Sequence, residues 1–271
     1  EAQNPIDEIQ IRWFDHWLKD IDTGLLEEST ICLFEMGSNS WREFNSLPSE
    51  QTTFYLASDG LASVREDSGM LWQYEELADL SPQELIATDL GETVTEFDNN
   101  TDILVHDPGR PVPALGVHAI YTSGSFERSL LDCRADILTY TSASLESDLH
   151  LTGAITLEVY CTTNNPSFDI CAVLSTVNPN GAVFNFTQGY IRVVAPDSQI
   201  NPLKIPLQPT CMYIQAGDRL RLSLSGACFP AYPLNSGDGK LPHESRQIDH
   251  CIITIKIHSG GDYPSKLVIN H

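Results

Sequence analysis

The sequence predicts a mainly β protein whose body is a β-sandwich, and three patterns support this prediction. Apolar residues alternate with polar ones over residues 155–161, which is the period-2 pattern of a strand with one buried face. The Asn-Pro-Asn-Gly sequence at 178–181 separates two apolar runs and is typical of a tight connection between paired strands. The same alternation returns at residues 220–224 and 251–257. Four or more such strands have to share one core, which favours two packed sheets.

The composition favours a folded protein and excludes some classes of partner. The 271 residues are enough for one large β domain and a smaller piece, and a hydrophobic content of 41% supports a proper core. The net charge of −22, from 37 acidic and 15 basic residues, argues against nucleic acid and against an anionic membrane surface as partners. The sequence has no long uncharged apolar run of the kind found in a signal peptide or a transmembrane helix.

The seven cysteines favour a reduced, cytoplasmic protein. They are odd in number and spread along the chain, and no C-x-x-C pair is present, so neither a zinc motif nor a redox motif is indicated. Most of them fall at strand positions, where free cysteine behaves as a small apolar residue. We therefore expect no metal site and no cofactor.

The chain is expected to begin with a helix over about residues 5–20, because Asn4 is a suitable N-cap and Pro5 suits the first helical position. The apolar residues of this helix form two stripes. One stripe contains Ile6, Ile9, Trp13 and Trp17, and the other contains Ile11, Phe14, Leu18 and Ile21. A surface helix needs only one stripe. The helix is therefore expected to be buried on two sides, or to lack a partner because the sequence is cut from a longer protein.

A nearly continuous apolar strand is expected over residues 30–37. Such runs are typical of sheets covered on both faces, so this helix and strand look like the end of an α/β domain that is too small to fold alone.

The polar residues 46–51 mark a boundary, and the β-rich part starts at residues 52–56. A short helix is expected at residues 81–85, where the sequence suits a helix cap. The three prolines within residues 107–116 predict an extended connector, because proline cannot donate a hydrogen bond within a central strand.

No catalytic residue can be nominated within the chain. A serine nucleophile of the α/β-hydrolase type lies in a G-x-S-x-G turn, and this sequence contains none. The nearest approaches, at residues 37–40 and 123–125, are interpreted as ordinary turns. Asp15 and His16 are neighbours on the expected helix and point about 100° apart, so a packed or partly exposed histidine is favoured over a catalytic base.

Two segments leave alternatives open. Residues 98–102 begin like a calcium loop, but Ile103 replaces the required glycine and Gly109 stands where glutamate is needed, so a solvated acidic loop is favoured. Phe229 and Tyr232 lie in an aromatic-proline cluster. They form either a carbohydrate-stacking platform or an ordered loop packed over the end of the sandwich, and the packed loop is favoured because aromatic side chains pack so routinely.

Short motifs along nearly the whole chain occur together and in a recognisable order. They are Trp13-Phe14-Asp15-His16-Trp17-Leu18, the run from Ile31 to Gly37 with Trp41-Arg42, Phe54-Tyr55-Leu56, Asp107-Pro108 through Pro111-Val112-Pro113 to Gly116, Phe168-Asp169 through Asn178 to Gly181, Gly189-Tyr190-Ile191-Arg192, Ala216 to Leu220, Phe229-Pro230 through Tyr232 to Asn235, and Ile257-His258 through Pro264-Ser265. On these motifs the chain resembles the C-terminal portion of the cocaine-esterase and X-prolyl dipeptidyl-peptidase group of α/β-hydrolases.

The resemblance implies a galactose-binding-like jelly roll over residues 49–271, preceded at residues 1–48 by the last helix and strand of an α/β-hydrolase domain. It also implies that the catalytic serine, aspartate and histidine lie upstream. The chain is then a non-catalytic C-terminal fragment of a serine hydrolase, of the acyl esterase or X-Pro dipeptidyl-peptidase type, and its partner is its own upstream catalytic domain. The rival from another class is an autonomous carbohydrate-binding module.

The resemblance nominates two groups of residues. Met212 and Tyr213 match an apolar-aromatic pair close to the active-site cleft of relatives, and they precede the sharp turn at residues 216–217, so they should lie near a sandwich edge. They are expected to line the substrate pocket or the domain interface, with Phe229 and Tyr232 as further candidates. The residues expected to contact the hydrolase domain are Trp13, Phe14, Trp17 and Leu18. Without that domain, their apolar surface is expected to drive self-association.

Two departures from the family pattern leave the substrate class open. The chain has Ala-Gly-Asp-Arg at residues 216–219 where the family often has Pro-Gly-His-Arg. It has Tyr-Pro-Leu-Asn at residues 232–235 where the family often has Tyr-Asp-Arg-Asn. These changes leave open whether the domain contacts that use the missing charges in the family exist here, so peptides, esters and other acyl compounds all remain candidate substrates of the parent enzyme.

Overall fold

The computed structural model describes residues 5–73, 100–116, 123–196 and 200–271. Its elements are α1 (Ile6–Lys19), η1 (Leu25–Glu27), β1 (Ile31–Glu35), β2 (Ser40–Phe44), β3 (Gln51–Ala57), β4 (Met70–Gln73), β5 (Asn100–His106), α3 (Ser129–Asp132), β6 (Ile137–Ser142), β7 (Leu149–Thr163), β8 (Ser167–Val177), β9 (Val183–Val194), β10 (Pro202–Ile214), β11 (Arg219–Ser225), η2 (Gln247–Asp249), β12 (Ile253–Ser259) and β13 (Lys266–Asn270). Three sequence predictions fall outside the described residues. They concern the N-cap at Asn4, the short helix at residues 81–85, and residues 98 and 99 of the segment that begins like a calcium loop.

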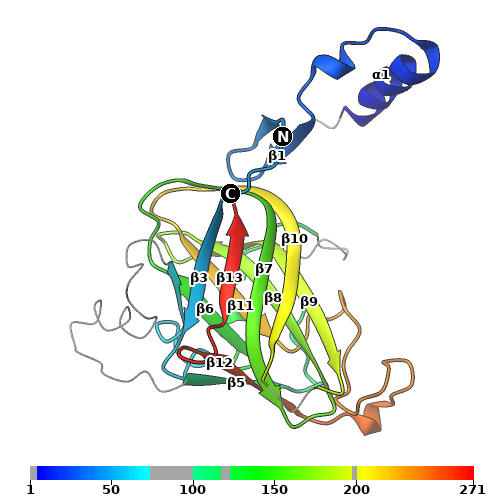
Figure 1. The fold of residues 1–271 in the computed structure, drawn as a ribbon. Coiled ribbons are helices and arrows are strands. Elements are labelled where there is room, and N and C mark those ends of the chain that lie inside the picture. The colour runs from blue at the N-terminus through cyan, green and yellow to red at the C-terminus, as the bar shows by residue number, and fades with distance from the viewer. Residues whose placement is uncertain (1–4, 74–99, 117–122, 197–199) are drawn as a thin grey trace.

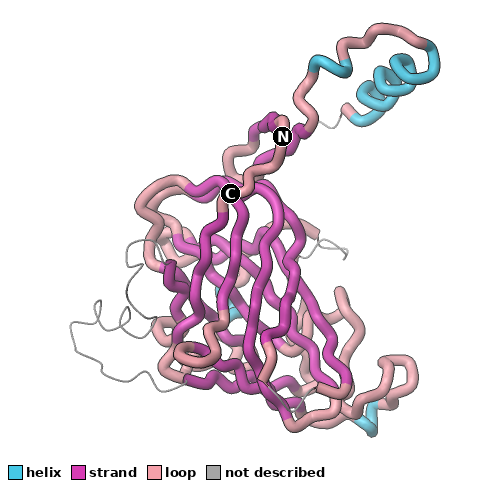
Figure 2. The backbone as a smooth tube through the Cα atoms, viewed as in Figure 1, coloured by secondary structure: helices cyan, strands magenta, loops and turns pink. Residues whose placement is uncertain are grey.

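Among the described residues, eleven strands pair into one continuous sheet that closes on itself. The strand order is β10-β9-β8-β11-β6-β4-β3-β13-β7-β12-β5, and β10 also pairs with β7. Figure 1 shows β3, β13, β7 and β10 side by side in the near layer, with β6, β11, β8 and β9 behind them. Strands dominate the described backbone, as Figure 2 shows. The predicted mainly β sandwich is therefore confirmed.

Strand β7 holds the near layer together. It pairs with β10 along one edge and with β13 and β12 along the other. The side chains of Ile155, Leu157 and Val159 are buried, whereas Thr156 and Glu158 between them are half-buried. This pattern confirms the predicted alternation, because successive side chains of a strand point to opposite faces of the sheet.

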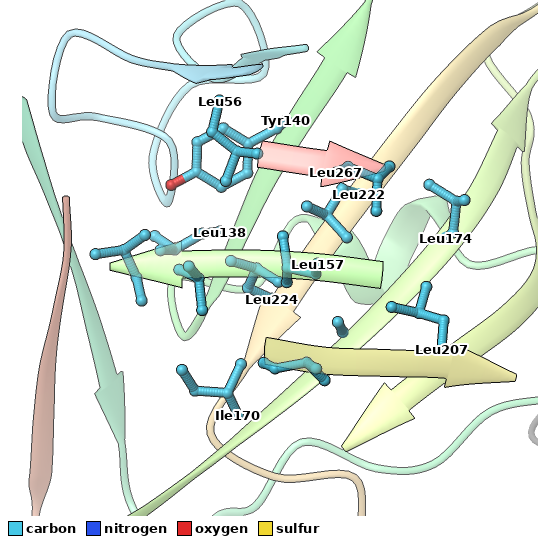
Figure 3. Close-up of a cluster of buried hydrophobic side chains, with 14 of the residues drawn as sticks. Leu56, Leu138, Tyr140, Leu157, Ile170, Leu174, Leu207, Leu222, Leu224 and Leu267 are labelled. Atoms are coloured by element: carbon cyan, nitrogen blue, oxygen red, sulfur yellow. The ribbon is translucent and has the colours of Figure 1, made fainter. Parts of the chain in front are cut away.

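Strand β8 is buried on both faces along its whole length. Ile170 and Leu174 belong to the main core between the two layers, where Figure 3 shows them among leucines from both layers. On the other face of β8, Cys171 and Val173 pack with Cys228 in a second, smaller cluster. The predicted turn at residues 178–181 joins β8 to β9, and the two strands pair antiparallel, as expected.

The structure corrects two interpretations of the sequence. Cys251 is exposed and precedes β12, which begins at Ile253, so it is not an inward-facing strand residue. Residues 100–106 do not form a solvated loop but strand β5. Within it, Asp102 is fully buried and accepts hydrogen bonds from the hydroxyls of Ser58 and Tyr140, both at 2.8 Å. Because these donors satisfy the carboxylate, a polar sequence can still form a buried strand.

Helix α1 stands apart from the sandwich, as Figures 1 and 2 show, whereas the strands that follow it reach one end of the sandwich. Helix α1 contains no buried residue; it begins at Ile6 because Pro5 takes the N-cap position, one residue later than predicted. Strands β1 and β2 form a separate two-stranded antiparallel ribbon, called the hairpin below. The predicted strand is confirmed, but the described residues do not cover it on both faces, since Cys32 is exposed.

Candidate functional site

The hairpin docks on one end of the sandwich, at the residues that the sequence nominated for a pocket or an interface. The Met36 N–H donates to the Cys211 carbonyl at 3.0 Å, and the Tyr213 N–H donates to the Met36 carbonyl at 2.8 Å. Gly37 has a φ of +89°, and a Cβ at this position would collide with the Tyr213 carbonyl oxygen. The absence of a side chain at Gly37 therefore lets the hairpin approach β10 this closely. The junction of hairpin and sandwich is the candidate site.

Met212 and Tyr213 lie at this junction and are both half-buried. Met212 packs against the edge of the main core. The Tyr213 ring lies against the ring of His150 on β7, with centroids 5.1 Å apart. A hydrogen bond from the Tyr213 hydroxyl to Asp148 is the main reason why the pKa of Tyr213 is raised. The carboxylate of Asp148 also accepts a hydrogen bond from the Ala216 N–H at 2.8 Å, so the turn after β10 helps to hold it in place.

A buried carboxylate, which the sequence analysis missed, lies on the hairpin side of the junction. The side chain of Glu35 is 1% exposed. Its carboxylate oxygens are 2.8 Å from His150 Nδ1, 2.7 Å from Ser38 Oγ and 2.7 Å from Arg42 Nη1. Burial on its own raises the pKa of Glu35, but these three hydrogen bonds outweigh burial and lower the pKa below its usual value. Glu35 is therefore an anion at neutral pH.

The apolar face of α1 is uncovered in the described part of the chain. The exposed fractions are 48% for Trp13, 50% for Phe14, 53% for Trp17 and 74% for Leu18. The ring of Trp13 contacts those of Phe14 and Trp17, with centroids 5.5 and 6.1 Å apart. The three rings, together with exposed Leu18, are called the aromatic patch below; exposed apolar surface of this kind marks protein interaction sites.

Phe229 and Tyr232 lie elsewhere, and Tyr232 packs over the outer face of β8. Phe229 is exposed, and its backbone pairs with the connector at Pro113. The Tyr232 ring stacks on the Tyr190 ring with centroids 4.0 Å apart and an interplanar angle of 4°. Gln188 also donates a hydrogen bond to the Tyr232 hydroxyl at 3.2 Å. One face of the Tyr232 ring is therefore covered, as the packed-loop interpretation expects.

Within residues 5–73, 100–116, 123–196 and 200–271, no group of three or more His, Cys, Asp or Glu side chains is arranged to hold a metal ion. In the same part of the chain, no helix is both long enough and apolar enough to span a membrane.

Comparisons with known proteins agree with the fold. The family of X-Pro dipeptidyl-peptidase C-terminal non-catalytic domains matches residues 24–268. Cocaine esterase of Rhodococcus sp. (strain MB1 Bresler) is 24% identical over 274 residues, covering 95% of this chain and 44% of the esterase. The crystal structure of an aminopeptidase from a marine sediment Thaumarchaeota archaeon matches with a TM-score of 0.75 and 19% identity, over 97% of this chain and 43% of that one.

An α-amino acid ester hydrolase has the same fold, with a TM-score of 0.73 and 18% identity, over 96% of this chain and 43% of that chain. At these identities, both solved structures show the fold alone. The chain spans less than half the length of each of the three relatives.

Proposed function

Because this chain belongs to the family of X-Pro dipeptidyl-peptidase C-terminal non-catalytic domains, we propose that it packs on an upstream α/β-hydrolase domain and helps to shape the substrate pocket of a serine hydrolase. The hydrolase acts on ester or amide bonds. Residues 1–48 complete the hydrolase domain, and residues 49–271 form the sandwich that packs on it. The observation that carries the proposal is the docking of the hairpin directly on the strand that holds Met212 and Tyr213.

The aromatic patch of α1 is the proposed contact with the catalytic domain. Trp13, Phe14, Trp17 and Leu18 are all about half exposed or more, although tryptophan and phenylalanine usually bury most of their surface. A neighbouring domain that covers this patch would remove a large apolar area from water. Relatives more than twice as long as this chain contain enough additional residues for such a domain.

Met212 and Tyr213 are proposed to form a wall of the substrate pocket. Ligand pockets combine apolar surface with a few well-placed polar groups, and this pair offers a thioether, a ring and one hydroxyl. Because Asp148 accepts a hydrogen bond from the hydroxyl and His150 lies against the ring, the position of Tyr213 is well defined before a ligand arrives. The alternative is that Tyr213 only fills the interface between the domains, since interfaces also favour tyrosine.

An activity assay separates this proposal from an independent function. The purified chain is expected to show no turnover of p-nitrophenyl esters or X-Pro anilides, because no nucleophile elbow is present in its sequence. The full-length hydrolase is expected to turn over at least one of these substrate classes. Serine-dependent turnover by the purified chain would overturn the proposed non-catalytic role.

The carbohydrate-binding alternative predicts a different result, and exposed Phe229 beside Tyr232 is the feature that favours it. It requires the purified chain to bind glycans in calorimetry and the Tyr232→Ala variant to lose that binding. We expect no glycan binding, because Tyr190 covers one face of the Tyr232 ring and the side chain is half-buried, which leaves little ring surface for a sugar.

A further inference from the structure

We propose that Glu35 is a positioning residue, which holds the hairpin on the sandwich and fixes the ring of His150 beside Tyr213. No substrate contact is assigned to Glu35 itself. The structural part of this inference concerns the described chain alone. The part that concerns substrate selectivity rests on the pocket role proposed above for Tyr213.

The contacts of Glu35 join three separate segments. Ser38 belongs to the turn of the hairpin, Arg42 to β2, and His150 to the start of β7 in the sandwich. The contact with His150 is a side-chain hydrogen bond that crosses from the hairpin to the sandwich. The next residue, Met36, makes the two backbone hydrogen bonds with β10, so side-chain and backbone contacts hold the same point of the hairpin.

The charge of Glu35 determines the tautomer of His150. An ionised carboxylate can only accept hydrogen bonds, so Nδ1 of His150 must carry the proton that it shares with Glu35 Oε1 at 2.8 Å. In the neutral ring, Nε2 is then unprotonated and can accept a hydrogen bond. The His150 side chain is 46% exposed, and its ring lies against that of Tyr213. Removing Glu35 should therefore change both the orientation and the hydrogen-bonding character of the surface next to Tyr213.

Substitution of Glu35 by methionine tests the structural part. Methionine has a similar volume but no oxygen, so the Glu35→Met variant removes all three hydrogen bonds. The ¹⁵N NMR spectrum of histidine-labelled chain is expected to show His150 moving from the Nδ1–H to the Nε2–H tautomer. Hydrogen exchange of the Met36 and Tyr213 amides is expected to accelerate at least tenfold, because the hairpin is released. The sandwich should stay folded, since Arg42 and His150 are exposed enough for water to replace Glu35.

The chain offers both a matched control and a rescue. Glu43 lies in the same hairpin but is exposed, so Glu43→Met should leave the His150 tautomer and the amide exchange unchanged. Glu35→Gln keeps one acceptor oxygen and should restore most of the wild-type behaviour. An unchanged Nδ1–H tautomer together with unchanged exchange in Glu35→Met would overturn the proposal.

The full-length hydrolase tests the functional part. Glu35→Met is expected to change the ratio of kcat/KM between a small and a bulky acyl substrate at least threefold, while Glu43→Met leaves the ratio unchanged. A changed tautomer with an unchanged ratio supports the positioning of the hairpin and of His150 by Glu35 but overturns any effect of that positioning on substrate selectivity. The Tyr213→Ala variant tests the pocket role itself. The two failures are therefore distinguishable.

Discussion

Replacing Asp132 with alanine is expected to lower the free energy of unfolding by about 3–5 kcal/mol, because the change leaves two buried arginines without their counter-ion. The Asp132 side chain is 1% exposed and lies between Arg128 and Arg221, which are also buried. Arg128 Nε donates to Asp132 Oδ1 at 3.0 Å, and Arg221 Nη1 lies 3.9 Å from Oδ2. Ser223 donates a further hydrogen bond to Oδ1 at 3.1 Å. Chemical denaturation of the purified chain measures this loss.

A surface ion pair supplies the control for Asp132. Asp136 pairs with Arg134 at 2.6 Å, but both side chains are partly exposed to water. The Asp136→Ala variant is therefore expected to lose less than about 1 kcal/mol. Thermal unfolding should show the same order, with a fall in melting temperature of about 10 °C for Asp132→Ala. If both variants lost the same free energy of unfolding, the stabilising role assigned to the buried charge cluster at Asp132 would be contradicted.

The purified chain is expected to self-associate through the aromatic patch of α1. Burying the exposed half of each indole removes on the order of 100 Å² of apolar surface from water, which corresponds to about 2–3 kcal/mol per tryptophan. Replacing both Trp13 and Trp17 by serine is therefore expected to weaken association at least about tenfold. This figure allows for the entropy that is lost when the chains associate and their side chains become ordered. Sedimentation velocity over a range of concentrations measures this change.

The patch can be distinguished from a general tendency to aggregate. Leu130 in α3 is 85% exposed and lies on the sandwich, so Leu130→Ser removes exposed apolar surface without touching α1. This variant should associate as the wild type does. A wild-type chain that is strictly monomeric at all concentrations, with the aromatic side chains packed on its own sandwich, would contradict the prediction.

The strands of the sandwich could be predicted where apolar residues alternate strictly, as in β7. Strand β5 was missed because its inward positions include Asp102 and His106, which break the apolar pattern. The donors that make the burial of Asp102 possible, on Ser58 and Tyr140, are 44 and 38 residues away in sequence. The same limit applies to the Asp132 cluster, whose Ser223 contact spans 91 residues.

The candidate site could be predicted only in part. The positions of Met212 and Tyr213 near the end of β10 follow from the turn that the structure confirms at Gly217, where φ is +92°. The sequence did not predict that Glu35 contacts the sandwich, because its partner His150 is 115 residues away and no pattern in the sequence connects the two. One signal was available: Glu35 is a single carboxylate at the end of an apolar strand and directly precedes Met36 and a glycine.

The selectivity of the full-length hydrolase with Tyr213→Ala tests the central claim most directly. The matched control is Tyr160→Ala, which removes another half-buried tyrosine from the opposite end of the pairing between β7 and β10. If Tyr213 forms a pocket wall, its loss should change the ratio of kcat/KM between small and bulky acyl substrates at least threefold while the melting temperature is held, and Tyr160→Ala should leave the ratio unchanged. A uniform loss of activity that follows a loss of stability in both variants would contradict the claim and leave Tyr213 as a packing residue.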